Sequence, residues 1–127
     1  MRFIALFICL SIVGISGITR AQQKDTIRVS NFGAHPYTYE NCVTCLQEAI
    51  SESGARVLSF EKGRYDIWPE GAIRRKYFIS NTSTEQECPS KVKTIGLLFE
   101  DMKDLMIEGN GATLMFHGKM TTIALER

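Results

Sequence analysis

Three acidic residues near the C-terminal end are candidates for acid–base chemistry. Asp101, Asp104 and Glu108 are close in sequence, and two convergent carboxyl groups can serve as general acid and general base. Asp101 and Asp104, however, flank a turn between two apolar runs, and Glu108 stands before Gly109 at the end of such a run. Aspartate is frequent in turns. We therefore expect solvated carboxylates here and not a catalytic pair.

Cys42 and Cys45 form a C-x-x-C motif directly after Asn41. A helix N-terminus lowers the pKa of a thiol, so the motif could carry redox chemistry. A redox motif also needs a buried strand before it, whereas residues 35–40, HPYTYE, are turn-like. A zinc site would need a second such pair. We expect neither a redox site nor a bound metal.

Trp68 and His117 are the remaining candidates. Trp68 is the only tryptophan and precedes Pro69, at the end of an apolar run. Its indole can serve as a flat surface for a ligand or pack into the core with its N–H satisfied. His117 lies between an apolar run and Gly118, where it can donate or accept a hydrogen bond to a ligand or play a structural part at a strand end.

One helix and several short strands must position these residues. Val43, Leu46 and Ile50 follow the spacing of one helix face, which predicts an amphipathic helix from Cys42 to Ser53. Asn41 is a suitable N-cap, and Gly54 stands where a left-handed C-terminal cap is expected.

The strand predictions follow alternating or short apolar runs bounded by turn formers. Strands are expected at 26–30, 57–60, 65–68 and 77–79. Four more are expected around Leu97, Met106, Met115 and Ala124, and each of these centres lies nine residues after the one before it. Such spacing suits an antiparallel sandwich or a solenoid of parallel strands. The single early helix favours the solenoid, because the open apolar end of a solenoid needs a cap.

The N-terminal segment resembles a secretory signal peptide. Arg2 precedes an apolar run from Phe3 to Ile18, and Thr19-Arg20-Ala21 offers small residues for cleavage. We expect residues 1–21 to be removed and the protein to be secreted or periplasmic. The remaining residues, 22–127, carry 13 basic and 14 acidic residues, so no electrostatic feature indicates a nucleic-acid partner, or a membrane partner after cleavage.

Three cysteines remain after that cleavage, Cys42, Cys45 and Cys88. An odd number in an exported protein allows at most one internal disulfide. Their pairing stays open.

Several segments carry a family resemblance. Three of them are similar to the opening of right-handed parallel β-helix enzymes that act on polysaccharides: NFGA at 31–34, CLQEAI at 45–50 and FEKGRY at 60–65. Four further segments resemble glycoside hydrolase family 110, the bacterial α-1,3-galactosidases: GRYDIWP at 63–69, YFISN at 77–81, IEGNG at 107–111 and FHGKM at 116–120. This resemblance covers nearly all of residues 25–127.

The resemblance implies an all-β right-handed parallel β-helix with an N-terminal capping helix. Residues 22–127 would form the cap and first coils of a truncated catalytic domain. The implied function is removal of terminal α-1,3-linked galactose from a glycan, without a cofactor, and the catalytic carboxyl groups are expected beyond Arg127. Trp68 and His117 are the candidate substrate-binding residues. The alternatives are a polysaccharide lyase, a polygalacturonase-like enzyme, and a non-catalytic glycan-binding or structural protein.

Overall fold

The fold is described from a computed structural model, which covers residues 25–54, 56–77 and 90–127. The segment expected to be a signal peptide, residues 1–21, and Cys88 lie outside the described residues. Within the described ranges, no helix has the length and apolar character needed to cross a bilayer.

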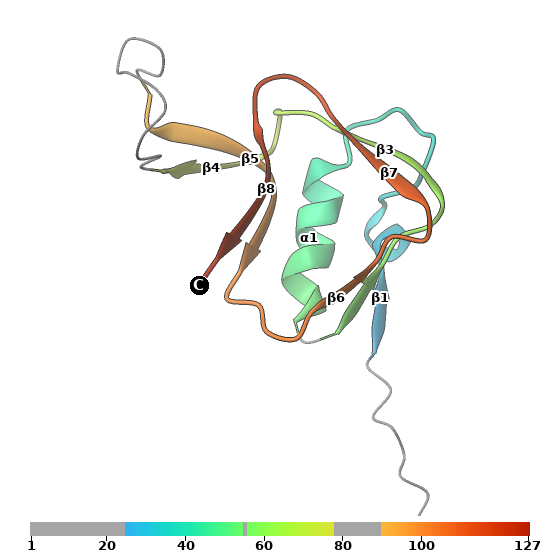
Figure 1. Ribbon diagram of the computed structural model, residues 1–127. Coiled ribbons are helices and arrows are strands. Elements are labelled where there is room, and N and C mark those ends of the chain that lie inside the picture. The colour runs from blue at the N-terminus through green and yellow to red at the C-terminus, as the bar shows by residue number, and fades with distance from the viewer. Residues whose placement is uncertain (1–24, 55, 78–89) are drawn as a thin grey trace, which may run out of the picture.

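The described chain forms one α-helix, one 3-10 helix and eight strands (Figure 1). In chain order, the elements are β1 (Thr26–Arg28), η1 (Val29–Phe32), α1 (Val43–Ser53), β2 (Val57–Ser59), β3 (Gly63–Ile67), β4 (Ile73–Lys76), β5 (Val92–Glu100), β6 (Met106–Glu108), β7 (Ala112–Phe116) and β8 (Thr121–Glu126). The strands form three small sheets, ordered β1-β2-β6, β3-β7 and β4-β5-β8.

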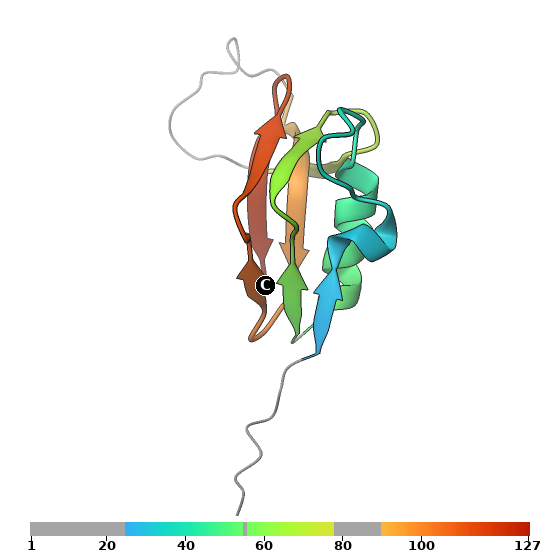
Figure 2. The same cartoon turned by 90° about the vertical axis from the view of Figure 1, so that its right-hand side faces the viewer.

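Four of the five strand pairs are parallel. Leu58 of β2 lies between Ile27 of β1 and Ile107 of β6, while β3 pairs with β7 and β5 pairs with β8. The fifth pair, β4 with β5, is antiparallel. Figure 2 shows β6, β7 and β8 at one end of the molecule and α1 at the other.

The expectation of an all-β right-handed parallel β-helix is wrong for this structure. The strands lie in separate small sheets, one of them mixes parallel and antiparallel pairs, and the described residues close no solenoid. The physical reason is that hydrophobic spacing locates strands without fixing their direction. The polar strand β4, with Arg74, Arg75 and Lys76, then pairs against β5 in the opposite sense.

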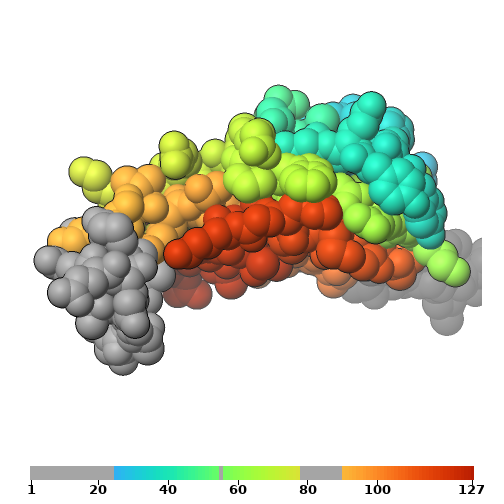
Figure 3. Space-filling view, turned by 90° about the horizontal axis from the view of Figure 1, so that it is seen from above, coloured from blue at the N-terminus to red at the C-terminus, as the bar shows by residue number. Residues whose placement is uncertain are grey.

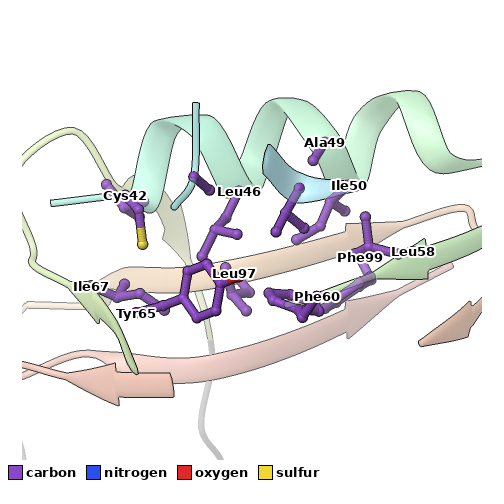
Figure 4. Packing of buried hydrophobic residues seen from close by; sticks show 13 residues of the cluster. Cys42, Leu46, Ala49, Ile50, Leu58, Phe60, Tyr65, Ile67, Leu97 and Phe99 are labelled. Atoms are coloured by element: carbon purple, nitrogen blue, oxygen red, sulfur yellow. The ribbon is translucent and has the colours of Figure 1, made fainter. Parts of the chain in front are cut away.

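The helix prediction is confirmed. α1 buries Val43, Leu46, Ala49 and Ile50 on one face. The side chains of Leu46 and Ile50 point at aromatic and aliphatic residues of the strands, among them Tyr65, Leu97 and Phe99 (Figure 4). Burying one such side chain stabilises the fold by roughly 1.5–3 kcal/mol.

Both helix ends differ in detail from the prediction. The N-cap position is Cys42, one residue later than expected, although the Oδ1 atom of Asn41 accepts a hydrogen bond from the Val43 N–H at 3.1 Å. Gly54 occupies the C-cap with φ 49° and ψ −132°, which is a positive φ outside the left-handed helical region.

The strand predictions hold best for the last third of the chain, where β5, β6, β7 and β8 lie at the expected centres. The predicted strand at 26–30 is shorter, because η1 begins at Val29. The strand expected at 77–79 is wrong for Tyr77, since β4 ends at Lys76; Phe78 and Ile79 lie outside the described residues.

Candidate functional site

The side chains of β3 alternate between the core and the opposite face. Tyr65 and Ile67 are buried among the core residues. Arg64 and Asp66 point to the other face, and Trp68 follows them at the strand end, as the period of two in a strand requires. In the view from above, the segments before α1 (cyan), around β3 (yellow-green) and around β7 (orange-red) lie in successive rows (Figure 3).

Trp68 and His117 are brought together by the β3–β7 pairing. The register matches Ile67 with Phe116, and the His117 N–H donates to the Ile67 carbonyl at 2.9 Å. The two residues that follow are therefore neighbours. Their rings stack with centroids 3.7 Å apart and an interplanar angle of 5°.

Asp66 contacts His117 of this pair and is only 3% exposed. The Nη2 and Nε groups of Arg64 donate to its Oδ1 atom at 2.6 and 3.1 Å, and Nε also reaches Oδ2 at 3.1 Å. The Nε2 atom of His117 lies 2.6 Å from Oδ1. A buried carboxylate is tolerated when it is paired and hydrogen-bonded in this way.

The charge state of Asp66 follows from these contacts. Hydrogen bonds from Arg64, and then from His117, lower the pKa of the Asp66 carboxyl and outweigh the opposing effect of burial. The same hydrogen bond raises the pKa of Arg64. Asp66 is therefore a carboxylate at neutral pH, and His117 uses its Nε2–H as the donor.

Tyr39 extends the cluster on the other side of Arg64. The guanidinium carbon of Arg64 lies 5.2 Å from the centroid of the Tyr39 ring, within the range of a cation–π contact. Tyr39 has φ 59°, a left-handed conformation that is uncommon for a tyrosine. We call Tyr39, Arg64, Asp66, Trp68 and His117 the Asp66 cluster.

Asn41 ties the cluster to the start of α1. Its Oδ1 atom accepts from the Trp68 N–H at 3.0 Å as well as from Val43, and its Nδ2 group donates to the Glu70 carbonyl at 2.7 Å. An isolated parallel bridge also pairs Asn41 with Asp66. One side chain thus fixes the end of β3 against the helix.

Cys42 has a structural role in this arrangement. Its Sγ and backbone N–H groups both donate to the Asp66 carbonyl, each at 3.0 Å. Burial raises the pKa of the Cys42 thiol to about 11. A thiol that stays protonated at neutral pH is a poor nucleophile. Cys42 and Cys45 are both free thiols.

The acidic residues of the C-terminal third lie where the sequence predicted. Asp101 and Asp104 occupy the connection between β5 and β6 with φ 52° and 55°, and Glu108 ends β6 on the exposed surface. Among the residues described, no three His, Cys, Asp or Glu side chains gather as a metal site.

Two of the five cluster residues were predicted from sequence and three were missed. Trp68 is 40% exposed, so the expectation that it is buried in the core is wrong. The substrate-binding role of Trp68 and His117 stays a prediction. Arg64 and Asp66 could have been found from their alternation with Tyr65 and Ile67, which puts two opposite charges beside Trp68 on one face.

Comparison with known proteins identifies the relatives of this chain. No protein-family model matches it. Over 109 residues, 84% of the chain, it is 72% identical to α-1,3-galactosidase A of Bacteroides fragilis. The chain resembles part of the α-1,3-galactosidases. This confirms the resemblance expected from its motifs.

Two further α-1,3-galactosidases are more distant. The chain is 37% identical over 128 aligned positions to α-1,3-galactosidase B of Phocaeicola vulgatus and 32% identical over 108 to α-1,3-galactosidase A of Peterkaempfera griseoplana. It spans 18% of the length of the B. fragilis α-1,3-galactosidase and 19% and 15% of the other two.

Proposed function

We propose that this chain is the N-terminal portion of a secreted glycoside hydrolase that removes terminal α-1,3-linked galactose from glycans. The observation that carries the proposal is the 72% identity over 109 residues to α-1,3-galactosidase A. The substrate would be a glycan that ends in α-linked galactose.

The catalytic carboxyl groups are proposed to come from the rest of the enzyme, beyond Arg127. Glycosidases need two carboxyl groups on either side of the scissile bond. Within the described residues, Asp66 is buried under Arg64 and His117, and Asp101 and Asp104 are exposed turn residues. Of these three, Asp101 and Asp104 line a common cavity, but they share it with the basic side chains of Lys103 and Arg127. The chain tested by itself should release no galactose.

A hybrid enzyme tests the proposal directly. Residues 25–127 of this chain would replace the matching segment of the B. fragilis α-1,3-galactosidase A, and galactose release would be measured on an α-1,3-galactosyl substrate. We expect activity within about tenfold of the parent enzyme, because a segment this similar should pack against the same neighbours. The control is the parent enzyme rejoined at the same junctions. A folded hybrid that releases no galactose would overturn the proposal.

Export is proposed on the resemblance of residues 1–21 to a signal peptide. Intact mass of the protein recovered outside the cytoplasm should correspond to a chain that begins at Gln22. A mass that retains Met1 would contradict cleavage.

A further inference from the structure

Two surface aromatic rings of the Asp66 cluster are each backed by a basic side chain. Tyr39 is 66% exposed and has the Arg64 guanidinium against its ring, while Trp68 has the His117 imidazole stacked on its indole. Arg64 and His117 both bind Asp66. One face of each ring therefore contacts a basic side chain of the protein. The exposed area of the ring lies on its remaining surface.

The rings are fixed in position before any ligand arrives. Asn41 binds the Trp68 backbone, and the Tyr37 N–H donates to the Arg64 carbonyl at 2.8 Å, which holds the loop that carries Tyr39. A surface whose side chains are already ordered loses less conformational entropy when it binds. Large aromatic rings usually stabilise a protein by being buried. Rings that are held in order at the surface are therefore candidates for a binding role.

The charges of the cluster favour an uncharged ligand. The Asp66 carboxylate offsets the Arg64 charge and accepts the His117 Nε2–H, so the Arg64–Asp66 pair has no net charge with which to attract an ion. Arg64 and His117 keep 36% and 22% of their side chains exposed.

The two rings are linked through the side chains that lie between them. The Arg64 guanidinium beside Tyr39 reaches along the strand to Asp66, which also binds His117, and the His117 ring stacks on Trp68. The two rings therefore belong to one connected surface.

We propose that Tyr39 and Trp68 form a binding surface for an uncharged oligosaccharide, with the two rings stacked on the apolar C–H faces of its sugar units. Arg64 donates to sugar hydroxyls from the exposed part of its side chain. The choice of a galactose-terminated glycan rests on the proposed function, whereas the stacking surface rests on the geometry of the cluster.

The test uses the full 127-residue chain and its own fluorescence. Trp68 is the only tryptophan, so indole emission reports this surface alone. Titration with a trisaccharide that ends in α-1,3-linked galactose should give a saturable change in emission, and free galactose should bind more weakly. A linear α-1,4-linked glucose trisaccharide serves as the comparison ligand.

Matched tyrosine variants locate the second ring. Tyr39→Ala should weaken trisaccharide binding by roughly three- to tenfold, the scale of one lost aromatic contact. Tyr37→Ala is the control, because Tyr37 is a similarly exposed residue of the same loop, at 59%, whose ring lies against the Gly63 backbone. Circular dichroism would confirm that both variants are folded.

Each outcome decides the proposal. Saturable binding that Tyr39→Ala weakens and Tyr37→Ala leaves unchanged supports it. No emission change with either trisaccharide overturns it, even if the hybrid enzyme is active. Equal weakening by both variants overturns the assignment of Tyr39, and binding of the glucose trisaccharide alone overturns the choice of galactose. Binding by the chain together with an inactive hybrid would overturn the proposed function and leave the oligosaccharide surface in place.

Discussion

Asp66 makes the stability of the protein depend on pH in acid. Arg64, and then His117, hold the pKa of the Asp66 carboxyl below its value in the unfolded chain. A group with a lowered pKa in the folded state stabilises the fold above its unfolded pKa, about 4 for aspartate, and loses that contribution as the pH falls through the folded pKa. Acid should therefore weaken the cluster below about pH 4.

Asp66→Asn should remove the contribution of this carboxylate to the pH dependence of stability. We expect the variant to lose roughly 1–2 kcal/mol of unfolding free energy at pH 7, because Arg64 keeps its charge without a carboxylate partner. The difference between the two proteins should narrow below about pH 4. Denaturant unfolding at pH 7 and at pH 3 measures both effects. Asp101→Asn is the control at an exposed turn; an equal loss in both variants would contradict the role of Asp66.

Gly63 is a second residue with a specific requirement. Its φ is 144°, and a Cβ atom there would lie 2.5 Å from the Pro36 side chain and 2.6 Å from the Tyr37 ring. Gly63→Ala should cost at least about 2 kcal/mol from backbone strain and overpacking. Gly109→Ala is the matched control, since nothing lies within 4 Å of its added carbon. Thermal unfolding compares the two, and equal melting temperatures would show that the loop adjusts freely.

At the scale of elements, α1 depends on its buried face. Leu46 is fully buried and Glu48 is exposed on the same helix. Leu46→Asp should destabilise the protein by more than about 4 kcal/mol, because it creates a cavity and buries a charge. Glu48→Ala should change the unfolding free energy by less than about 0.5 kcal/mol. Similar denaturant midpoints for the two variants would show that α1 does not cover the core.

The elements that sequence predicts well are those with a continuous apolar pattern. α1 has its i, i+3, i+7 spacing, and β5 buries five consecutive residues, Ile95 to Phe99. β4 was missed because Ile73 is its one apolar residue, and the strand is held by pairing with β5 and by an ion pair between Arg75 and Glu100 at 2.9 Å. Those partners are far away in the sequence.

The candidate site also combines features that a local pattern predicts with features that depend on distant parts of the sequence. Trp68 and His117 were noticed by residue type, but their contact depends on the register of β3 with β7, which no local pattern contains. Tyr39 was not noticed, because its position beside Arg64 comes from a left-handed backbone in a loop. The overall fold was wrong for a related reason, since strand direction is a long-range property.

At the scale of the whole molecule, the end formed by β6, β7 and β8 gathers exposed apolar side chains of the described residues. Met106, Ile107, Ile123 and Leu125 are all at least half exposed. A cavity of about 540 Å³ opens beside them, lined in part by Phe99 and Leu105. Exposed edge strands with apolar side chains promote pairing with other chains.

We therefore expect the purified chain to self-associate through this end. Light scattering should show oligomers at micromolar concentration, and Leu125→Lys should shift the population towards monomer, because a charged side chain on an edge strand opposes strand pairing. Tyr37→Lys is the control, as it replaces an exposed aromatic residue in the loop before α1. A monomer at all concentrations, or an equal shift by both variants, would contradict this interface.

The double acceptor role of Asn41 has a consequence for local opening of the structure. The amide protons of Val43 and Trp68 share a single oxygen as their partner. When that side chain swings away, both protons become available to solvent in the same event. Their hydrogen–deuterium exchange should therefore proceed with similar protection, although one belongs to a helix and the other to the end of a strand. The first turn of α1 and the position of Trp68 then form one cooperative unit.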